Sequence, residues 1–152
     1  MTTTLNAKLL KGAMLTGVIN AFINGGIQYF FLKAYSSIAI SVDSITNNED
    51  TVLGTSVTLS ITLAMILTMV AYFGIKEKKV AFFPSAFWLT IKHGFFTFGV
   101  LTSLAVLWQK YAGTVEVSLI SALIIIGVIA GMVNYLTLRE CTLSERHKLY
   151  TA

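Results

Sequence analysis

The stretch TGVINAFINGGIQYF (Thr16–Phe30) decides the fold, because it is apolar enough for a lipid bilayer. A segment in hydrocarbon must satisfy its own backbone groups, which predicts a helix here. Polar side chains recur at every fourth residue of the stretch: Thr16, Asn20, Asn24 and Gln28. On a helix of 3.6 residues per turn they form a slowly winding stripe about 120° wide. We expect this stripe to face other helices or an aqueous path, since lipid tails offer amides no partners.

Two interpretations of the stripe stay open at the level of sequence. In the first, the amides form hydrogen bonds across packed helices, and Gly17, Gly25 and Gly26 allow a close approach. In the second, the amides line a narrow polar route or a binding cavity. Amides supply donors and acceptors without a fixed charge, which suits a neutral solute, water or a partly dehydrated ion.

The rest of the chain repeats the pattern of long apolar segments between short charged ones. It has 152 residues, of which 55% are hydrophobic and 12% are charged. About 20 helical residues cross a hydrocarbon core of about 30 Å. We therefore predict an all-α integral membrane protein, a four-helix bundle forming a single domain over residues 1–152. The predicted spans are Gly12–Leu32, Val52–Ile75, Ser85–Trp108 and Val117–Leu138.

The basic residues predict how the chain crosses the membrane. One side would carry most of them, and the other only Lys33 and Lys110. By the positive-inside rule, both termini and the middle loop are then cytoplasmic, and the acidic loop Asp43–Asp50 faces outward. We expect a multi-pass protein of a cell membrane, the bacterial inner membrane, in contact with the lipid bilayer. The net charge of +4 reflects this orientation, so no nucleic-acid partner is expected.

An internal repeat predicts two similar helical hairpins. MVAYFGIKE (Met69–Glu77) resembles MVNYLTLRE (Met132–Glu140), and KGAMLTGV (Lys11–Val18) more weakly resembles KHGFFTFGV (Lys92–Val100). Because two crossings return the chain to its starting side, both hairpins should have the same, parallel orientation. The alignment also favours a boundary position for Lys92, with its ammonium among the headgroups, over a position about 10 Å deep.

Further polar and small residues in the spans are candidates for packing or for function. Gly127 and Gly131 have small-xxx-small spacing with Asn134 nearby, which favours a close helix crossing inside the subunit or between subunits. His93 is the only imidazole near a span, and it is a candidate gate or proton relay. Its alternative role is a plain hydrogen bond at the interface. Four helices leave little room for a cavity, so we expect a homo-oligomer.

Several classes of function are not supported by the sequence. All seven acidic residues lie outside the predicted spans, so a transporter driven by a buried carboxylate has no candidate. One histidine makes no metal site, and we expect neither a metal nor a cofactor. The single cysteine, Cys141, excludes an intrachain disulfide. No catalytic constellation is visible, so the protein is not expected to be an enzyme.

Two functions fit what remains. The first is a small permease or channel-like protein for a neutral solute or simple ion, with the amide stripe along the route. The second is a noncatalytic membrane scaffold or an accessory subunit that binds a membrane protein partner.

Overall fold

The computed structural model describes residues 2–43, 50–74 and 81–150, with side chains for residues 10–43, 50–74 and 81–141. It confirms the predicted all-α fold, because four long helices dominate the described chain. Each contains a segment long and apolar enough to cross a membrane. The helices are α1 (Thr2–Leu32), α3 (Val52–Gly74), α4 (Phe87–Ala112) and α5 (Leu119–Tyr150).

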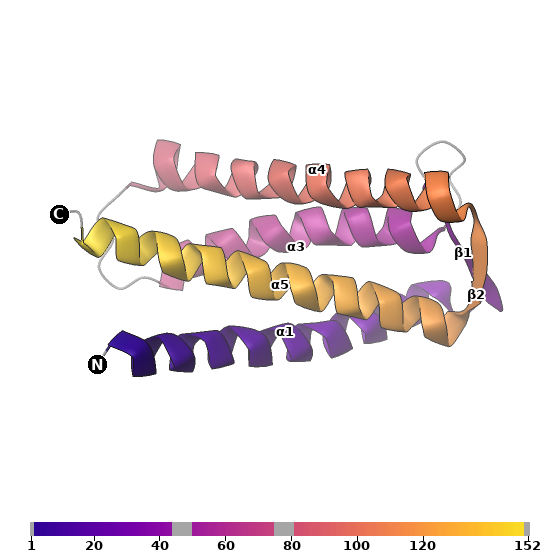
Figure 1. The fold of residues 1–152 in the computed structure, drawn as a ribbon, viewed down its shortest axis with the longest axis horizontal. Helices are drawn as coiled ribbons and strands as arrows, with labels where there is room; N and C mark the ends of the chain where they lie inside the picture. The colour runs from indigo at the N-terminus through magenta and orange to yellow at the C-terminus, as the bar shows by residue number, and fades with distance from the viewer. Residues whose placement is uncertain (1, 44–49, 75–80, 151–152) are drawn as a thin grey trace.

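The helices run as the repeat predicts. Helices α1 and α4 point in one direction and α3 and α5 in the other, so both hairpins have the same orientation (Figure 1). Both chain termini lie at one end of the molecule, which we call the terminal end. A multi-pass membrane protein with an even number of spans has this arrangement.

A two-stranded sheet at the other end was not predicted from the sequence. Strand β1 (Ser37–Ile40) lies in the connection after α1, and β2 (Val115–Ser118) lies between α4 and α5. They pair antiparallel, with Ile38 opposite Val117. Alternating β-branched residues in SIAI and VEVS favour such strands. The sheet joins the connections of both hairpins, and we call this end of the molecule the sheet end (Figure 1).

The helices pack in the order α1, α5, α3, α4. The helices of one hairpin are thus not each other's main neighbours: among the described residues, α1 packs chiefly on α5, and α4 on α3. Exchanging the two hairpins turns the α1–α5 contact into the α4–α3 contact. It leaves the α3–α5 and β1–β2 pairs unchanged. This is the contact pattern of an approximate two-fold axis along the helices, as parallel repeats require.

The hydrophobic core is concentrated at the sheet end. Buried Ile38 and Ile40 of β1 pack with residues from three helices: Leu32, Val52, Ala122 and Ile126. Two polar residues fix the starts of helices here. The Thr51 hydroxyl accepts a hydrogen bond from Gly54 N at 3.2 Å, and the Ser118 hydroxyl accepts one from Ser121 N at 3.3 Å. Both are N-caps, which satisfy backbone donors that a helix leaves free.

The terminal end is joined by aromatic rings. A short kinked turn, η1 (Phe82–Ala86), precedes α4, and its Phe83 has an extended backbone. The Phe82 ring stacks on Phe73 of α3, with centroids 5.6 Å apart, and lies 6.5 Å from the Phe87 ring. These contacts connect the end of α3 to the start of α4.

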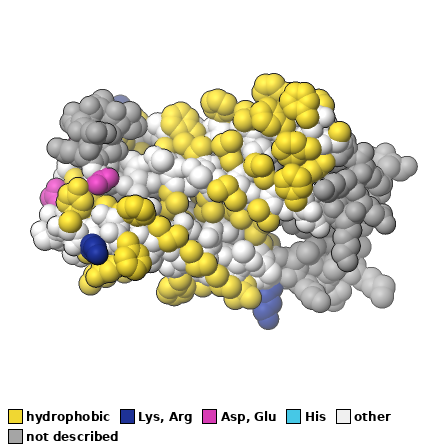
Figure 2. Space-filling view, turned by 180° about the vertical axis from the view of Figure 1, so that it is seen from behind, with side chains coloured by type: hydrophobic (Ala, Val, Ile, Leu, Met, Phe, Trp, Pro, Cys, Tyr) yellow, Lys and Arg dark blue, Asp and Glu magenta, His cyan; other side chains and the backbone are white. Residues whose placement is uncertain are grey.

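The outer surfaces of the helices are apolar, as lipid contact requires. Phe22, in the middle of α1, is 79% exposed. Figure 2 shows hydrophobic side chains over much of one face, with charged side chains near its two ends. Lys92 is exposed near the terminal end of α4, and Lys110 is exposed near the sheet end. They are about 27 Å apart along the helix, close to the thickness of a hydrocarbon core, which fits a boundary position for Lys92.

Candidate functional site

The amide stripe of α1 is turned only partly toward the other helices. Asn24 is buried, and its Nδ2 donates to the backbone oxygen and to Oδ1 of Asn20, each at 2.9 Å. Asn20 and Gln28 are half-buried. Thr16 is exposed and donates its hydroxyl proton to the Gly12 carbonyl at 2.9 Å. The middle of the stripe is therefore shielded from lipid, while its Thr16 end faces outward.

The glycines beside the stripe lie where α1 crosses α5. Gly17 faces Gly131, and a Cβ at Gly131 would lie 2.8 Å from the Gly17 carbonyl oxygen. One turn along, a Cβ at Gly127 would lie 2.9 Å from the Ala21 carbonyl oxygen. Backbone therefore touches backbone over two turns, which is the approach that small-xxx-small spacing permits. The structure thus places Gly127 and Gly131 at a helix crossing inside the subunit.

Several polar atoms lie buried without a hydrogen-bond partner in the described part of the chain. They are Asn20 Nδ2 of α1, Ser60 Oγ of α3, Thr102 Oγ1 and Gln109 Oε1 of α4, and Asn134 Oδ1 of α5. Ser60 is fully buried, and Asn134 is 1% exposed. Native proteins rarely leave such atoms unpaired, and bound water or a ligand commonly satisfies them. These unpaired atoms are a structural indication of polar occupants among the helices.

Most hydroxyls of α3 are satisfied within their own helix. Ser56 and Thr68 are buried and donate to the carbonyls one turn back at 2.7 Å. Thr58 and Thr62 are exposed and bond in the same way, at 3.2 and 3.1 Å. Such bonds let hydroxyls lie in hydrocarbon without other partners. The exposed threonines therefore indicate no site, and Ser60 differs from them.

A hydrogen-bonded pair of polar side chains from two helices lies at the terminal end. The Thr68 hydroxyl of α3 is 2.7 Å from Nδ1 of His93 on α4. His93 is half-buried.

Helix α5 extends beyond the span predicted from hydropathy. It continues without a break to Tyr150, so Glu140, two residues past the predicted span, stays on the helix that packs on α3.

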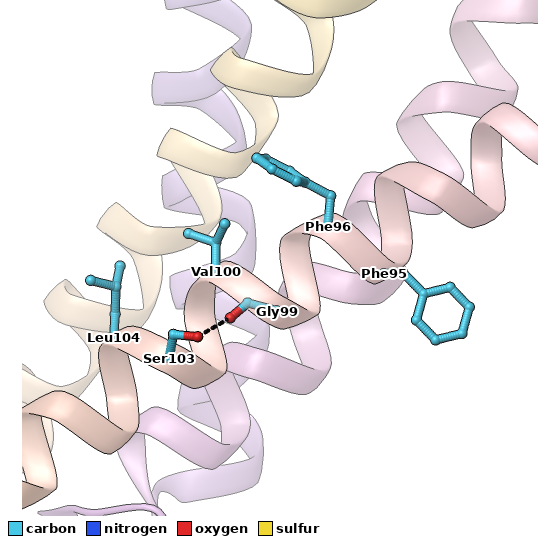
Figure 3. A pocket seen from close by; sticks show the side chains of 6 residues that line it. All are labelled: Phe95, Phe96, Gly99, Val100, Ser103 and Leu104. Carbon is cyan, nitrogen blue, oxygen red and sulfur yellow. Dashed lines mark hydrogen bonds between the residues drawn. The ribbon is translucent and has the colours of Figure 1, made fainter.

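The other surface and side-chain groupings of the described residues offer few groups that could bind a ligand. Among the residues whose side chains are described, no group of three or more metal-ligating side chains comes together. A shallow hollow on α4 is lined by Phe95, Phe96, Gly99, Val100, Ser103 and Leu104 (Figure 3). All six belong to one helix, and Ser103 donates to the Gly99 carbonyl at 2.7 Å. The hollow thus presents no converging polar groups.

Comparison with known proteins gives no further guidance: no family model, curated protein or solved structure matches this chain.

Proposed function

We propose that this protein is a small permease or channel-like protein for a neutral solute or a simple ion. One observation carries the proposal: polar atoms of Asn20, Ser60 and Asn134 are buried without partners in three apolar helices. Each such atom costs about 1–3 kcal/mol if it stays unpaired. Water or a polar solute between the helices would remove this cost for each atom, which supports a hydrated route.

The chemistry of these groups limits what would use the route. Amides and hydroxyls donate and accept hydrogen bonds but carry no charge. They replace part of the hydration of a small neutral molecule or a partly dehydrated ion. Asn20 and Asn24 would contact the solute from α1, and Ser60 from α3.

We further propose the orientation that the basic residues favour. The terminal end, with exposed Lys11, Lys92 and Arg139, would face the cytoplasm, and the sheet end would face outward. The lysines of the loop between α3 and η1 belong to the same prediction, but lie outside the described residues. A bacterial inner membrane is the expected location.

A flux measurement tests the route. Whole protein in liposomes should speed the entry of glycerol or of sodium ions, and the double variant Asn20→Leu with Asn24→Leu should abolish the gain. The matched control is Thr58→Leu with Thr62→Leu, because both threonines are exposed on α3. The control should keep the flux. If a folded Asn20/Asn24 double variant transports as the wild type does, the stripe has no part in transport.

A second function is favoured by a different observation. The Asn24 amide donates two hydrogen bonds, both to Asn20, and the glycines beside it pack α1 on α5. This arrangement suits a noncatalytic membrane scaffold or an accessory subunit, in which the amides stabilise the fold. A second copy or another membrane protein would then cover the outer helix faces. In that case the wild type moves no solute, and the double variant loses stability or assembly.

A further inference from the structure

The hydrogen bonds within the amide stripe fix which end of the Asn20 amide is free. Asn24 Nδ2 lies 2.9 Å from the Asn20 backbone oxygen, which can only accept, so this atom of Asn24 is the donating nitrogen. The same nitrogen lies 2.9 Å from Asn20 Oδ1, which must therefore accept. The remaining atom of the amide, Asn20 Nδ2, is a donor that is buried without a partner in the described part of the chain.

A second unpaired amide lies on the same flank of the α1–α5 pair. Gly17 of α1 faces Gly131 of α5. Asn20 follows Gly17 by three residues and Asn134 follows Gly131 by three, so both are rotated from this contact by the same angle. Because α1 and α5 run in opposite directions, equal rotations bring both side chains to one flank. They lie on either side of the glycine contact, about 9 Å apart along the helices.

This flank of the α1–α5 pair faces protein and not lipid. Asn134 is 1% exposed, whereas Val128, as far round α5 on the opposite flank, is 52% exposed. Ile126 lies on the Asn134 side of α5 and packs with Val52 of α3 in the hydrophobic core. The two asparagines therefore lie on the side of α1 and α5 that is turned toward α3.

We infer that Asn20 and Asn134 form the two ends of a binding site for a small neutral solute that both accepts and donates hydrogen bonds. An oxygen of the solute accepts from Asn20 Nδ2, and a hydroxyl or amide group of the solute donates to Asn134 Oδ1. Among the described residues that oxygen is buried without a partner, so it lacks such a donor. The inference rests on the proposed permease and names its substrate class, a polyol or a small amide.

The two free groups disfavour ions. Proteins bind hard cations through oxygen atoms. A sodium ion here would meet the oxygen of Asn134 but the positive N–H end of the Asn20 amide. An anion would meet the reverse. A neutral solute with both kinds of group satisfies both asparagines, and it gives up less hydration than an ion when it leaves water.

The nitrogen spectrum of the asparagine side chains tests the site without any assay of transport. The whole chain, labelled with nitrogen-15 asparagine, is placed in lipid nanodiscs, and Asn20→Gln and Asn134→Gln identify the two signals by their loss. Glycerol should shift both signals in the wild type, and sodium chloride should shift neither. Signals that ignore glycerol, or that respond to sodium chloride, overturn the inference. So do contacts to long-lived water that glycerol does not displace, because structural water then fills the site.

Solute flux tests the substrate class. Liposomes that hold the whole protein should take up glycerol faster than empty liposomes do, with no gain for sodium ions. Asn20→Leu and Asn134→Leu should each slow glycerol entry about tenfold, as the loss of one hydrogen bond allows. The matched control is Thr62→Leu, because Thr62 is exposed on α3 and should keep the flux. Circular dichroism confirms that each variant is folded.

The outcomes separate the two proposals. Sodium entry as fast as glycerol entry, or glycerol entry that survives both substitutions in folded variants, overturns the inference and leaves the permease standing. Absence of flux for both solutes refutes the permease, while the nitrogen spectrum still decides whether the two asparagines bind glycerol.

Discussion

The α1–α5 contact and the α3–α4 contact both join one hairpin to the other and are related by exchange of the two hairpins, yet they are built differently. At the first, glycines bring backbone against backbone. At the second, Gly94 of α4 faces the flexible side chain of Met65, and a hydrogen bond joins Thr68 to His93. The α1–α5 contact therefore depends on the close fit of two backbones. The α3–α4 contact depends on the flexible Met65 side chain and on the hydrogen bond between Thr68 and His93.

The largest effect is expected from filling the α1–α5 contact. A side chain at Gly131 meets the Gly17 carbonyl oxygen at 2.8 Å, and backbone cannot move aside cheaply. Gly131→Leu should lower the free energy of unfolding by about 3 kcal/mol, as overpacking does. Thermal unfolding in detergent, followed by circular dichroism, measures it. The control is Gly26→Leu on α1, where nothing lies within 4 Å of the added Cβ. Equal stability of both variants would mean that α1 does not pack on α5 in this register.

A smaller loss is expected at the polar pair of the α3–α4 contact. Thr68→Val keeps the shape but leaves His93 Nδ1–H without its acceptor, which should cost about 1–2 kcal/mol. Thr62→Val on the same helix is the control, because Thr62 is exposed and bonds within its own helix. The same unfolding experiment compares the two. If Thr62→Val lowers the free energy of unfolding as much as Thr68→Val does, the hydrogen bond between Thr68 and His93 does not contribute to stability.

The glycine of the α3–α4 contact should tolerate a methyl group. A Cβ at Gly94 would lie 2.9 Å from Cγ of Met65, but that side chain can take another rotamer. The helix also gains up to about 1 kcal/mol when alanine replaces glycine. Gly94→Ala should therefore change the free energy of unfolding by less than about 1 kcal/mol, against a clear loss for Gly131→Ala. If Gly94→Ala costs more than Gly131→Ala, the two contacts are not built as described.

The smallest effect concerns the exposed hydrogen bond at the sheet end, outside both contacts. The Tyr35 hydroxyl donates to Oδ2 of Asp50 at 3.2 Å, and this bond, with the nearby negative charge, raises the pKa of Tyr35. Because the pKa of Tyr35 is raised in the folded protein, its protonated hydroxyl stabilises the fold. This stabilisation is fully present below the ordinary pKa of about 10, and it is lost as the pH rises through the raised pKa. Tyr35→Phe should thus be slightly less stable than the wild type at pH 7, and equal to it at strongly alkaline pH. Phenolate absorbance in Asp50→Asn should show Tyr35 titrating earlier. If Tyr35 titrates at the same pH in Asp50→Asn as in the wild type, the hydrogen bond between Tyr35 and Asp50 does not form.

The fold was largely predictable, because each long apolar segment has to satisfy its own backbone in lipid. The parallel hairpins followed from two similar segment ends and an even number of crossings. The sheet was missed, since SIAI and VEVS are four residues each and pair across 75 or more residues of chain. Nothing local distinguishes such strands from loop before the partner is known.

The candidate site was predicted only in part. The amide stripe and His93 were visible as polar residues in apolar segments. Their partners were not, because hydrogen bonds such as Thr68 to His93 join different helices. Hydropathy ends a predicted span at the first charges, whereas helix α5 continues past them to Tyr150.

Sequence by itself determined that four helices cross a bilayer, since that outcome depends on the length and hydropathy of each segment alone. Tertiary structure decided which helices are neighbours: in the described part of the chain, α1 packs chiefly on the last helix rather than on its own hairpin partner. It also decided which polar atoms find partners and which stay buried without them. The physical reason is that hydrophobicity acts on each segment independently, whereas close packing and hydrogen bonding depend on the relative rotation and register of two helices.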